Sequence, residues 1–377
     1  MEAAAAPKRD YDFAEILTRM SEERASDVHL TPGYPPAMRL RGKIVGLEEY
    51  GRLMPQQTRD TVYSLLNDDQ RKRFESDKQL DLAYAVPGVA RFRVNCFFQR
   101  GSISAAFRRI PHQIPALDEL GLPKVLEELT RKPRGLILVT GPTGSGKSTT
   151  LAAMLDIINA ERDEHILTIE DPIEFLHGHK RCIVNQREIG ADAEDFAGAL
   201  RAALREDPDV ILVGEMRDLE TMSTALTAAE TGHLVFATLH TQSTAQTVDR
   251  IIDVFPATQQ AQVRMQLSIG LQGIITQQLL PTVDGAGRVV ATEVLIPTPA
   301  VRNLIREGKT HQIYSAIQTS GALGMQTMDA HLAQLVRTSR ISRKLAEQRA
   351  SVPEELKRLL GSTPGNGAVA PAMTGGG

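Results

Sequence analysis

Cysteine is scarce in this chain of 377 residues, which holds only Cys96 and Cys182. Neither belongs to a pair spaced like the C-x-x-C motif of zinc sites. We therefore expect neither a structural zinc site nor a disulfide scaffold. A reducing compartment is the natural setting for such a composition, and the sequence predicts a cytoplasmic protein.

Long apolar runs and an excess of charge are also absent. The strongest apolar run, Leu136–Val139, is far shorter than the roughly 20 residues of a transmembrane helix. The opening MEAAAAPKRDYDF places its charges after the alanines, unlike a secretory signal. Lys and Arg number 43 against 46 Asp and Glu, so no global basic field indicates a nucleic-acid partner. We expect a soluble chain that meets a membrane only through a partner protein.

The length exceeds that of one ordinary core and predicts two domains. Residues 11–110 combine helical spacing with short strand-like stretches, which predicts a small α+β domain. Prolines recur at Pro111, Pro115 and Pro123. They mark residues 111–118 as a linker.

Residues 119–360 are predicted to form a second, larger domain. Strand and helix patterns alternate in its first half, which is typical of a parallel sheet covered on both faces. From Thr244 onward helices are expected to dominate. Residues 1–10 are expected to form a flexible leader, and residues 361–377 hold too little apolar bulk to order themselves.

A glycine-rich stretch carries the strongest chemical signal. Gly141–Ser148 reads GPTGSGKS and matches G-x-x-x-x-G-K-[ST], with a predicted strand before it and a predicted helix after it. Such a loop aims backbone N–H groups at phosphate oxygens. Lys147 is expected to reach the β- and γ-phosphates and Ser148 to ligate Mg²⁺. We expect ATP with Mg²⁺ rather than an empty turn, bound by Gly141, Pro142, Thr143, Gly144, Ser145, Gly146, Lys147, Ser148 and Thr149.

Acidic residues follow two further predicted strands. One strand leads to Glu215, and an acid at the carboxyl end of a strand in this kind of sheet faces the ligand crevice. Glu215 is therefore expected to help hold Mg²⁺. The other leads to Glu170, Asp171 and Glu174, and hydrolysis needs a carboxylate that orients the attacking water. The spacing alone does not decide which of the three does so, and a polar loop is the alternative.

Two histidines bracket a third predicted strand, Leu234–Thr238, with His233 before it and His240 after it. Their positions make them candidates for sensors of the γ-phosphate. The alternative is that each is a structural hydrogen-bonding group. The sequence shows no third potential zinc ligand near them, so a zinc site is not expected.

Together these stretches resemble the secretion-type ATPases. GPTGSGKSTT, ILTIEDPIEF, the run ending at Glu215 and TGHLVFATLHT are similar to the family's Walker A, Asp box, Walker B and His box, in the family's order. The run AVRNLIREGKTHQIYS from Ala300 resembles the signature of the type IV pilus retraction ATPases, with Val301 in place of the usual isoleucine. The likeness covers about residues 11–345.

The resemblance implies a fold and an assembly. Each subunit is expected to combine an N-terminal PAS-like domain with a RecA-like α/β P-loop ATPase domain, and six subunits are expected to form a ring. Nucleotide is expected to bind between the two domains. The match also implies that Glu174 is the general base, Glu215 the Walker-B acid, and His233 and His240 the His-box residues.

The resemblance further implies that arginines of the N-terminal domain reach the phosphates. Arg93 and Arg108 occupy the matching positions. A guanidinium can neutralise charge that develops on the transferred phosphoryl group. The alternative for both residues is a solvated strand face.

The function implied is that of a hexameric motor, in which ATP hydrolysis drives type IV pilus retraction and twitching motility. It would act on the pilin fibre through a platform protein, at the cytoplasmic face of the inner membrane. The helix that contains Val301 is then either a coupling surface or ordinary core packing.

Three rival functions remain open at this stage. The first is an assembly or secretion ATPase, which usually carries a four-cysteine zinc module; this chain has no cysteine after Cys182. The second is an accessory retraction paralogue, against which the stretch RNLIRE argues. The third, from another class, is a nucleotide sensor that does not hydrolyse ATP.

Overall fold

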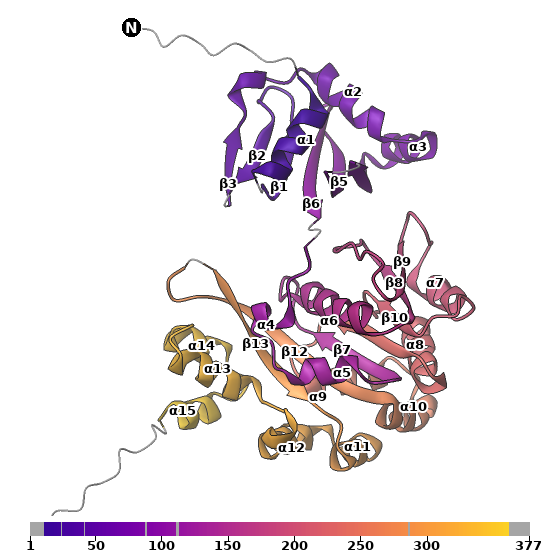
Figure 1. The fold of residues 1–377 in the computed structure, drawn as a ribbon, viewed down its shortest axis with the longest axis vertical. Coiled ribbons are helices and arrows are strands. Elements are labelled where there is room, and N and C mark those ends of the chain that lie inside the picture. The colour runs from indigo at the N-terminus through magenta and orange to yellow at the C-terminus, as the bar shows by residue number, and fades with distance from the viewer. Residues whose placement is uncertain are drawn as a thin grey trace, which may run out of the picture. The chain divides into compact units, whose positions relative to one another are not determined.

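The computed structural model describes residues 11–361 except residues 24, 41, 87, 88, 111, 112 and 286. It divides into two compact units (Figure 1). Unit 1 comprises Met1–Ile114 with Pro172–His177, and unit 2 comprises Pro115–Asp171 with Gly178–Gly377. The predicted leader and almost all of the predicted tail lie outside the described residues.

Unit 1 is built on an antiparallel six-stranded sheet in the order β3-β2-β1-β6-β5-β4. Its strands are β1 (Asp27–Leu30), β2 (Ala37–Leu40), β3 (Lys43–Gly46), β4 (Gln79–Val86), β5 (Ala90–Gln99) and β6 (Ser102–Ile110). Its helices are α1 (Phe13–Glu22), α2 (Pro55–Leu65) and α3 (Asp68–Asp77), with a 3₁₀ turn at Glu48–Tyr50. This architecture confirms the predicted α+β class.

The sequence of β5 shows how unit 1 sorts its side chains. Phe92, Val94 and Cys96 are buried, whereas the alternate residue Arg93 is exposed. Successive side chains of a strand point to opposite faces of the sheet. The apolar set therefore packs in the core with residues such as Phe107, and the other face carries the arginine.

Unit 2 is built on a seven-stranded sheet in the order β13-β12-β7-β11-β10-β8-β9. Its strands are β7 (Gly135–Thr140), β8 (His165–Glu170), β9 (Ile183–Glu188), β10 (Val210–Val213), β11 (Leu234–Leu239), β12 (Leu271–Pro281) and β13 (Arg288–Leu295). All neighbours pair in parallel except β12 and β13. Every residue of β7 and β11 is buried, as expected for strands covered on both faces.

Helices cover this sheet (Figure 1). They are α4 (Leu117–Leu120), α5 (Val125–Thr130), α6 (Lys147–Glu161), α7 (Phe196–Ala203), α8 (Leu219–Thr231), α9 (Thr244–Asp253), α10 (Ala257–Gly270), α11 (Pro299–Arg306), α12 (Ile313–Thr319), α13 (Met328–Arg337), α14 (Arg343–Arg349) and α15 (Pro353–Gly361). Two 3₁₀ turns, Thr310–Gln312 and Gly321–Leu323, flank α12. The alternation of strands and helices confirms the predicted α/β P-loop fold.

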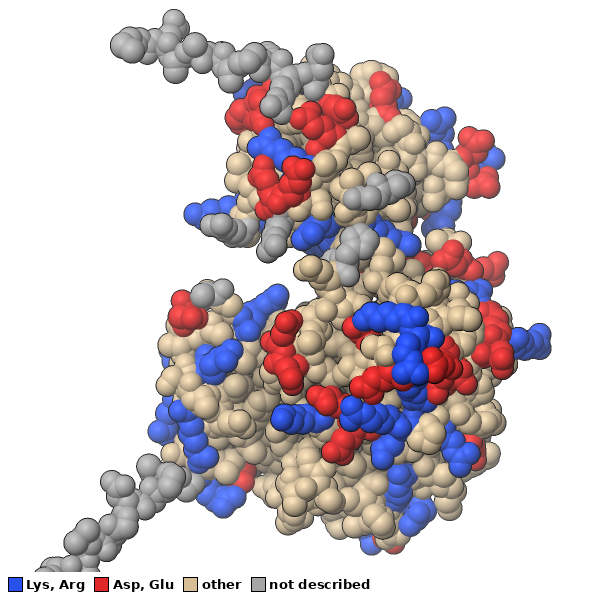
Figure 2. Space-filling view, in the orientation of Figure 1, with Lys and Arg blue, Asp and Glu red and all other residues tan. Residues whose placement is uncertain are grey.

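Within the described part of the chain, no helix combines the length and apolar character needed to cross a membrane. On the face of unit 2 seen in Figure 2, acidic and basic side chains are interspersed. This mixing agrees with the nearly balanced charge of the sequence.

The expectation that helices dominate after Thr244 is wrong for residues 271–295, which form the hairpin of β12 and β13. A short apolar run such as LQGIITQQLL does not reveal by its periodicity whether it is strand or helix. Tertiary pairing decides, because Ile274 and Ile275 lie opposite Leu138 and Val139 of β7. The hairpin thereby places β12 directly beside the strand that leads into the glycine loop.

Candidate functional site

The glycine loop joins β7 to α6 and owes its shape to its glycines. Gly141, Gly144 and Gly146 have φ of 138°, 78° and 90°, a region that side chains disfavour. A Cβ on Gly141 would lie 2.2 Å from the backbone oxygen of Gln277. The loop can therefore take this tight path only with glycine at position 141.

Lys147 opens helix α6, and its ammonium lies across the loop. Its Nζ donates hydrogen bonds to the backbone oxygens of Gly141 at 2.9 Å and Pro142 at 3.2 Å. Ser148 and Thr149 follow in the first helical turn and are half-buried. The first N–H groups of a helix have no partner within that helix and favour an anion. Loop, helix start and ammonium together offer groups that could hold a phosphate.

Gln277 of β12 supports this loop through two side-chain hydrogen bonds. Its side chain is 1% exposed, and its Nε2 donates to the backbone oxygen of Ser145 at 2.7 Å while its Oε1 accepts from Thr150 Oγ1 at 3.0 Å. It thus ties the loop to the first turns of α6. The sequence reasoning missed Gln277, although a polar residue inside an apolar strand is a usable signal.

A cavity of about 330 Å³ opens beside Gly146 and Thr149. Its walls include Leu120, Leu122 and Leu279. Mostly apolar walls with a few polar groups are typical of small-molecule sites.

Glu215 and His240 meet at the ends of the neighbouring strands β10 and β11. His240 Nε2 lies 2.8 Å from Glu215 Oε1, and Arg217 also donates to that carboxylate. Burial alone would raise the pKa of Glu215, but the hydrogen bond from Arg217 and the charges of His240 and Arg217 outweigh it and lower the pKa. Because β7, β11 and β10 run in parallel, this ionised carboxylate lies at the same edge of the sheet as the phosphate loop.

His233 lies at the opposite end of β11 from His240, and its expected role as a sensor of the γ-phosphate stays a prediction. It precedes β11, and its ring contacts the backbone oxygen of Ala228 at 3.0 Å. The six residues of β11 separate it from His240 by roughly 20 Å. Within this subunit only His240 reaches the phosphate-loop edge. No group of three or more His, Cys, Asp or Glu in the described residues is arranged to hold a metal ion.

The three carboxylates at and after the end of β8 have different surroundings. Glu170 is 9% exposed and accepts a hydrogen bond from Gln186 at 3.1 Å, so it is tied into unit 2. Asp171 is exposed. Glu174 is also exposed and belongs to Pro172–His177, the segment that groups with unit 1. Nothing in the sequence pattern indicated that grouping.

Arg93 and Arg108 are direct cross-strand neighbours on β5 and β6. Their side chains are 48% and 68% exposed. Arg108 Nε donates to Asp27 Oδ1 at 2.9 Å, and Arg93 Nε lies 3.9 Å from Asp81 Oδ1. Like charges directly opposite one another destabilise a sheet, and these two carboxylates offset that repulsion. The pair forms an exposed surface suited to an anion.

The segment after Ala300 forms α11. Val301 and Ile305 are fully buried in the core of unit 2, which agrees with core packing. Arg302 donates to the backbone oxygens of Ser268 and Ile269 at the end of α10, a favourable place for a cation. A coupling role for the exposed residues of α11 remains a prediction.

Comparisons with known proteins agree with this geometry. Residues 6–352 match the family described as type II/IV secretion system protein. The type IV pilus retraction ATPase PilT of Pseudomonas aeruginosa is 55% identical over 343 residues, which cover 91% of this chain and 99% of that protein. The type IV pilus ATPase PilU of the same bacterium is 43% identical, covering 93% of this chain and 91% of that protein.

A solved structure is similar over nearly the whole chain. It is a crystal structure of the pilus retraction motor PilT with bound ADP, at 53% sequence identity and a TM-score of 0.87. The match covers 93% of this chain and 100% of that one.

Proposed function

This chain belongs to the type II/IV secretion system protein family, and on that premise we propose that it is an ATPase that drives retraction of a type IV pilus. One observation carries the enzymatic part: a complete phosphate loop lies at the same sheet edge as the ionised Glu215 and its partner His240. The 55% identity to a pilus retraction ATPase supports the pilus as its target.

ATP is the proposed substrate. The loop N–H groups and Lys147 would hold its phosphates, and the cavity of about 330 Å³ beside Gly146 would take the adenine. Hydroxyl and carboxylate oxygens are the donors that Mg²⁺ prefers, so Ser148 and Glu215 fit this ion. Bound Mg²⁺ neutralises charge on the phosphates.

Other residues take roles in the cleavage itself. Glu174 orients the attacking water. Arg93 and Arg108 neutralise charge on the transferred phosphoryl group. His240 reports the state of the nucleotide through its contact with Glu215. Glu174 and both arginines belong to unit 1, whereas the phosphate loop belongs to unit 2.

We also propose how copies of the chain assemble and where in the cell they act. Six copies form a ring, and closure of the two units around ATP passes from subunit to subunit. The ring acts on a platform protein at the cytoplasmic face of the inner membrane. Pilin subunits then leave the base of the fibre, which produces twitching motility.

The rival functions are less well supported. An assembly or secretion ATPase with a four-cysteine zinc module does not fit a chain with two cysteines. An accessory paralogue is disfavoured because identity to PilU is 43%, against 55% to PilT. A nucleotide sensor that does not hydrolyse ATP would show no turnover after purification.

Deletion of the gene, followed by counting of surface pili, tests the proposal. The deletion strain is expected to carry surplus fibres that do not retract, and the unchanged gene to restore retraction where a Lys147→Ala copy does not. Bald cells would indicate an assembly ATPase instead. Normal fibre numbers with normal retraction would contradict the proposal.

A further inference from the structure

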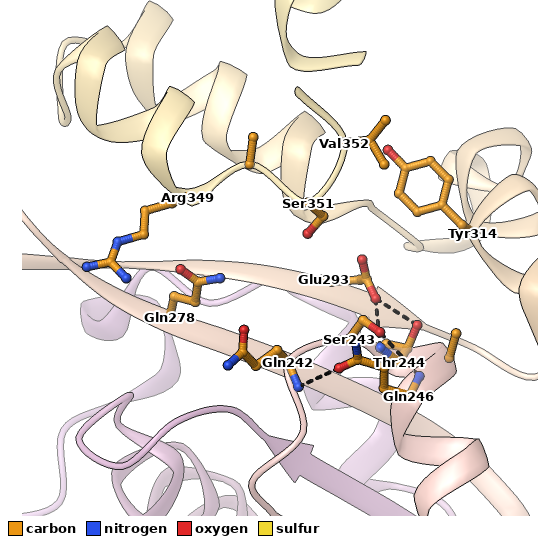
Figure 3. A pocket seen from close by; sticks show the side chains of 12 residues that line it. Gln242, Ser243, Thr244, Gln246, Gln278, Glu293, Tyr314, Arg349, Ser351 and Val352 are labelled. Carbon is orange, nitrogen blue, oxygen red and sulfur yellow. Dashed lines mark hydrogen bonds between the residues drawn. The ribbon is translucent and has the colours of Figure 1, made fainter. Parts of the chain in front are cut away.

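A cavity of about 450 Å³ lies in unit 2 between the start of α9, the β12–β13 hairpin and the C-terminal helices. Figure 3 shows Glu293 projecting from its strand toward this cavity, with Ser351 and Tyr314 across from it. Glu293 is 2% exposed. A carboxylate so deeply buried is costly unless it is well hydrogen-bonded, so its partners indicate why it is there.

Those partners are the first residues of two helices. Glu293 accepts hydrogen bonds from the backbone N–H and the hydroxyl of Thr244, both at 2.8 Å. The backbone N–H of Met328 donates to it as well. Thr244 begins α9 and Met328 begins α13. One carboxyl group therefore accepts hydrogen bonds at two helix N-termini, where the helix dipoles favour an anion.

On the α9 side, Thr244 is close in sequence to His240, at the edge of the sheet that carries the phosphate loop. His240 precedes Thr244 by four residues. A chain of four residues spans at most about 14 Å, so Thr244 limits how far the short loop that carries His240 can lie from the start of α9.

The strand that carries Glu293, β13, is paired through β12 to β7, the strand that leads into the phosphate loop. Thr140, Thr276 and Glu293 lie directly opposite one another on β7, β12 and β13. The hydroxyls of Thr140 and Thr276 are 2.8 Å apart, and Thr140 is the residue before Gly141. Glu293 is thus in register with the base of the loop.

The α13 side leads into the C-terminal helices. Asp329, the second residue of α13, is fully buried and accepts hydrogen bonds from Tyr314 and from the N–H groups of Ser351 and Val352. These contacts join α12 and the α14–α15 connection to the start of α13. The carboxylate of Glu293 therefore connects three parts: the His240 loop, the phosphate-loop strands and the C-terminal helices.

We propose that Glu293 is a positioning residue of the ATPase site, holding the His240 loop in place relative to the phosphate loop through the start of α9. The inference rests on the proposed function. It predicts that loss of the carboxylate's charge slows cleavage while nucleotide still binds, because no atom of Glu293 belongs to the phosphate loop. Burial raises the pKa of Glu293, and the hydrogen bonds from Thr244 and Met328 oppose that rise.

The test compares three variants of the purified full-length chain. Glu293→Gln keeps the shape and is expected to lower kcat about tenfold, with the Kd for ATP unchanged within about twofold. Thr244→Val removes one of the hydrogen bonds and is expected to lower kcat about threefold. Asp329→Asn is the matched control: it alters an equally buried carboxylate within α13 whose hydrogen-bond donors are Tyr314, Ser351 and Val352 and not Thr244. It is expected to lower the melting temperature and leave kcat unchanged.

A lower kcat in Glu293→Gln, together with normal kcat in the Asp329→Asn control, supports the inference. Equal loss of kcat in both, or normal kcat in Glu293→Gln, overturns it. If Glu293→Gln does not fold, Thr244→Val decides, and normal kcat in that variant overturns the inference. Absence of ATP turnover in the unchanged chain would overturn the proposed function, and the inference with it.

Discussion

The two units differ in the groups that they would offer to a phosphate. In unit 2 the proposed binding groups are backbone N–H groups fixed by glycine geometry and braced by Gln277, which is 1% exposed. In unit 1 they are side chains, Arg93 and Arg108, which are 48% and 68% exposed. The first set is fixed by the backbone, whereas the second consists of two like charges that Asp27 and Asp81 partly offset.

Because of this difference, we expect one set of groups to determine the affinity for nucleotide and the other to determine the rate of cleavage. A rigid backbone cradle binds at little entropic cost, because few groups need to be ordered. Exposed guanidiniums paired with Asp27 and Asp81 could exchange a carboxylate for a phosphate. We therefore expect changes in the phosphate loop of unit 2 to weaken nucleotide binding, and changes at the arginines of unit 1 to slow cleavage of bound nucleotide.

The largest effect is expected from Lys147→Ala in unit 2. Removing the ammonium takes a point charge from the β- and γ-phosphates, and ATP hydrolysis should fall at least about a hundredfold. Release of inorganic phosphate measures it. Lys344→Ala, which alters an exposed lysine of α14, is the control and should hydrolyse normally. Normal turnover in Lys147→Ala would overturn the site assignment.

Arg108→Ala in unit 1 should lower kcat almost as much, by roughly a hundredfold. Its Kd for ATP should change little, in contrast to Lys147→Ala. Arg39→Ala is a matched control, since Arg39 also lies near Asp27, at 3.7 Å. If both variants lose kcat equally, the effect reflects the Asp27 cluster and not contact with phosphate.

Glu174→Gln should permit ATP binding and slow cleavage by about a hundredfold, because the group that orients the water is lost. Single-turnover cleavage of bound ATP measures this step. Asp171→Asn, three residues earlier in the chain, should stay within about threefold of the unchanged chain. Unimpaired cleavage in Glu174→Gln would eliminate Glu174 as the base.

Gln277→Leu tests the brace of the phosphate loop. The backbone oxygen of Ser145 and the hydroxyl of Thr150 would lose their partner, and the KM for ATP should rise about tenfold. Gln278→Leu changes the adjacent residue, which points to the other face of β12 and lines the larger cavity (Figure 3). An equal rise of KM in both variants would show that the brace is not specific.

The smallest expected effect concerns the pH dependence of stability. The pKa of Glu215 is lowered from its ordinary value of 4.5, so its ionised form stabilises the folded state. That stabilisation is present above pH 4.5 and is lost as the pH falls through the lower, folded-state pKa. The difference in melting temperature between the unchanged chain and Glu215→Gln should shrink between pH 6 and pH 3. A constant difference would contradict the pairing with Arg217 and His240.

Local patterns in the sequence predicted what depends on contiguous residues. The phosphate loop and the strand before Glu215 follow from short motifs, because each motif defines its own turn and strand. Gln277, Asp27 and Glu293 were not predicted, since their roles arise from strand pairing between distant segments. The β12–β13 hairpin was misassigned for the same reason.

The candidate site shows the same limit. Spacing placed His233 and His240 on either side of a strand but did not show that only one end of that strand meets the phosphate loop. Neither did it show that Pro172–His177, which contains Glu174, groups with unit 1. The resemblance to a known family assigned Glu174 and the two arginines, whereas spacing alone left them open.

Isothermal titration calorimetry with Mg²⁺ and ATP tests the central claim most directly, on the Glu174→Gln chain so that cleavage does not obscure binding. The account predicts a saturable heat of association for this chain. The heat should disappear when the same chain also carries Lys147→Ala, and it should persist when the chain carries Arg108→Ala instead. Absence of heat in Glu174→Gln and in the unchanged chain would contradict it.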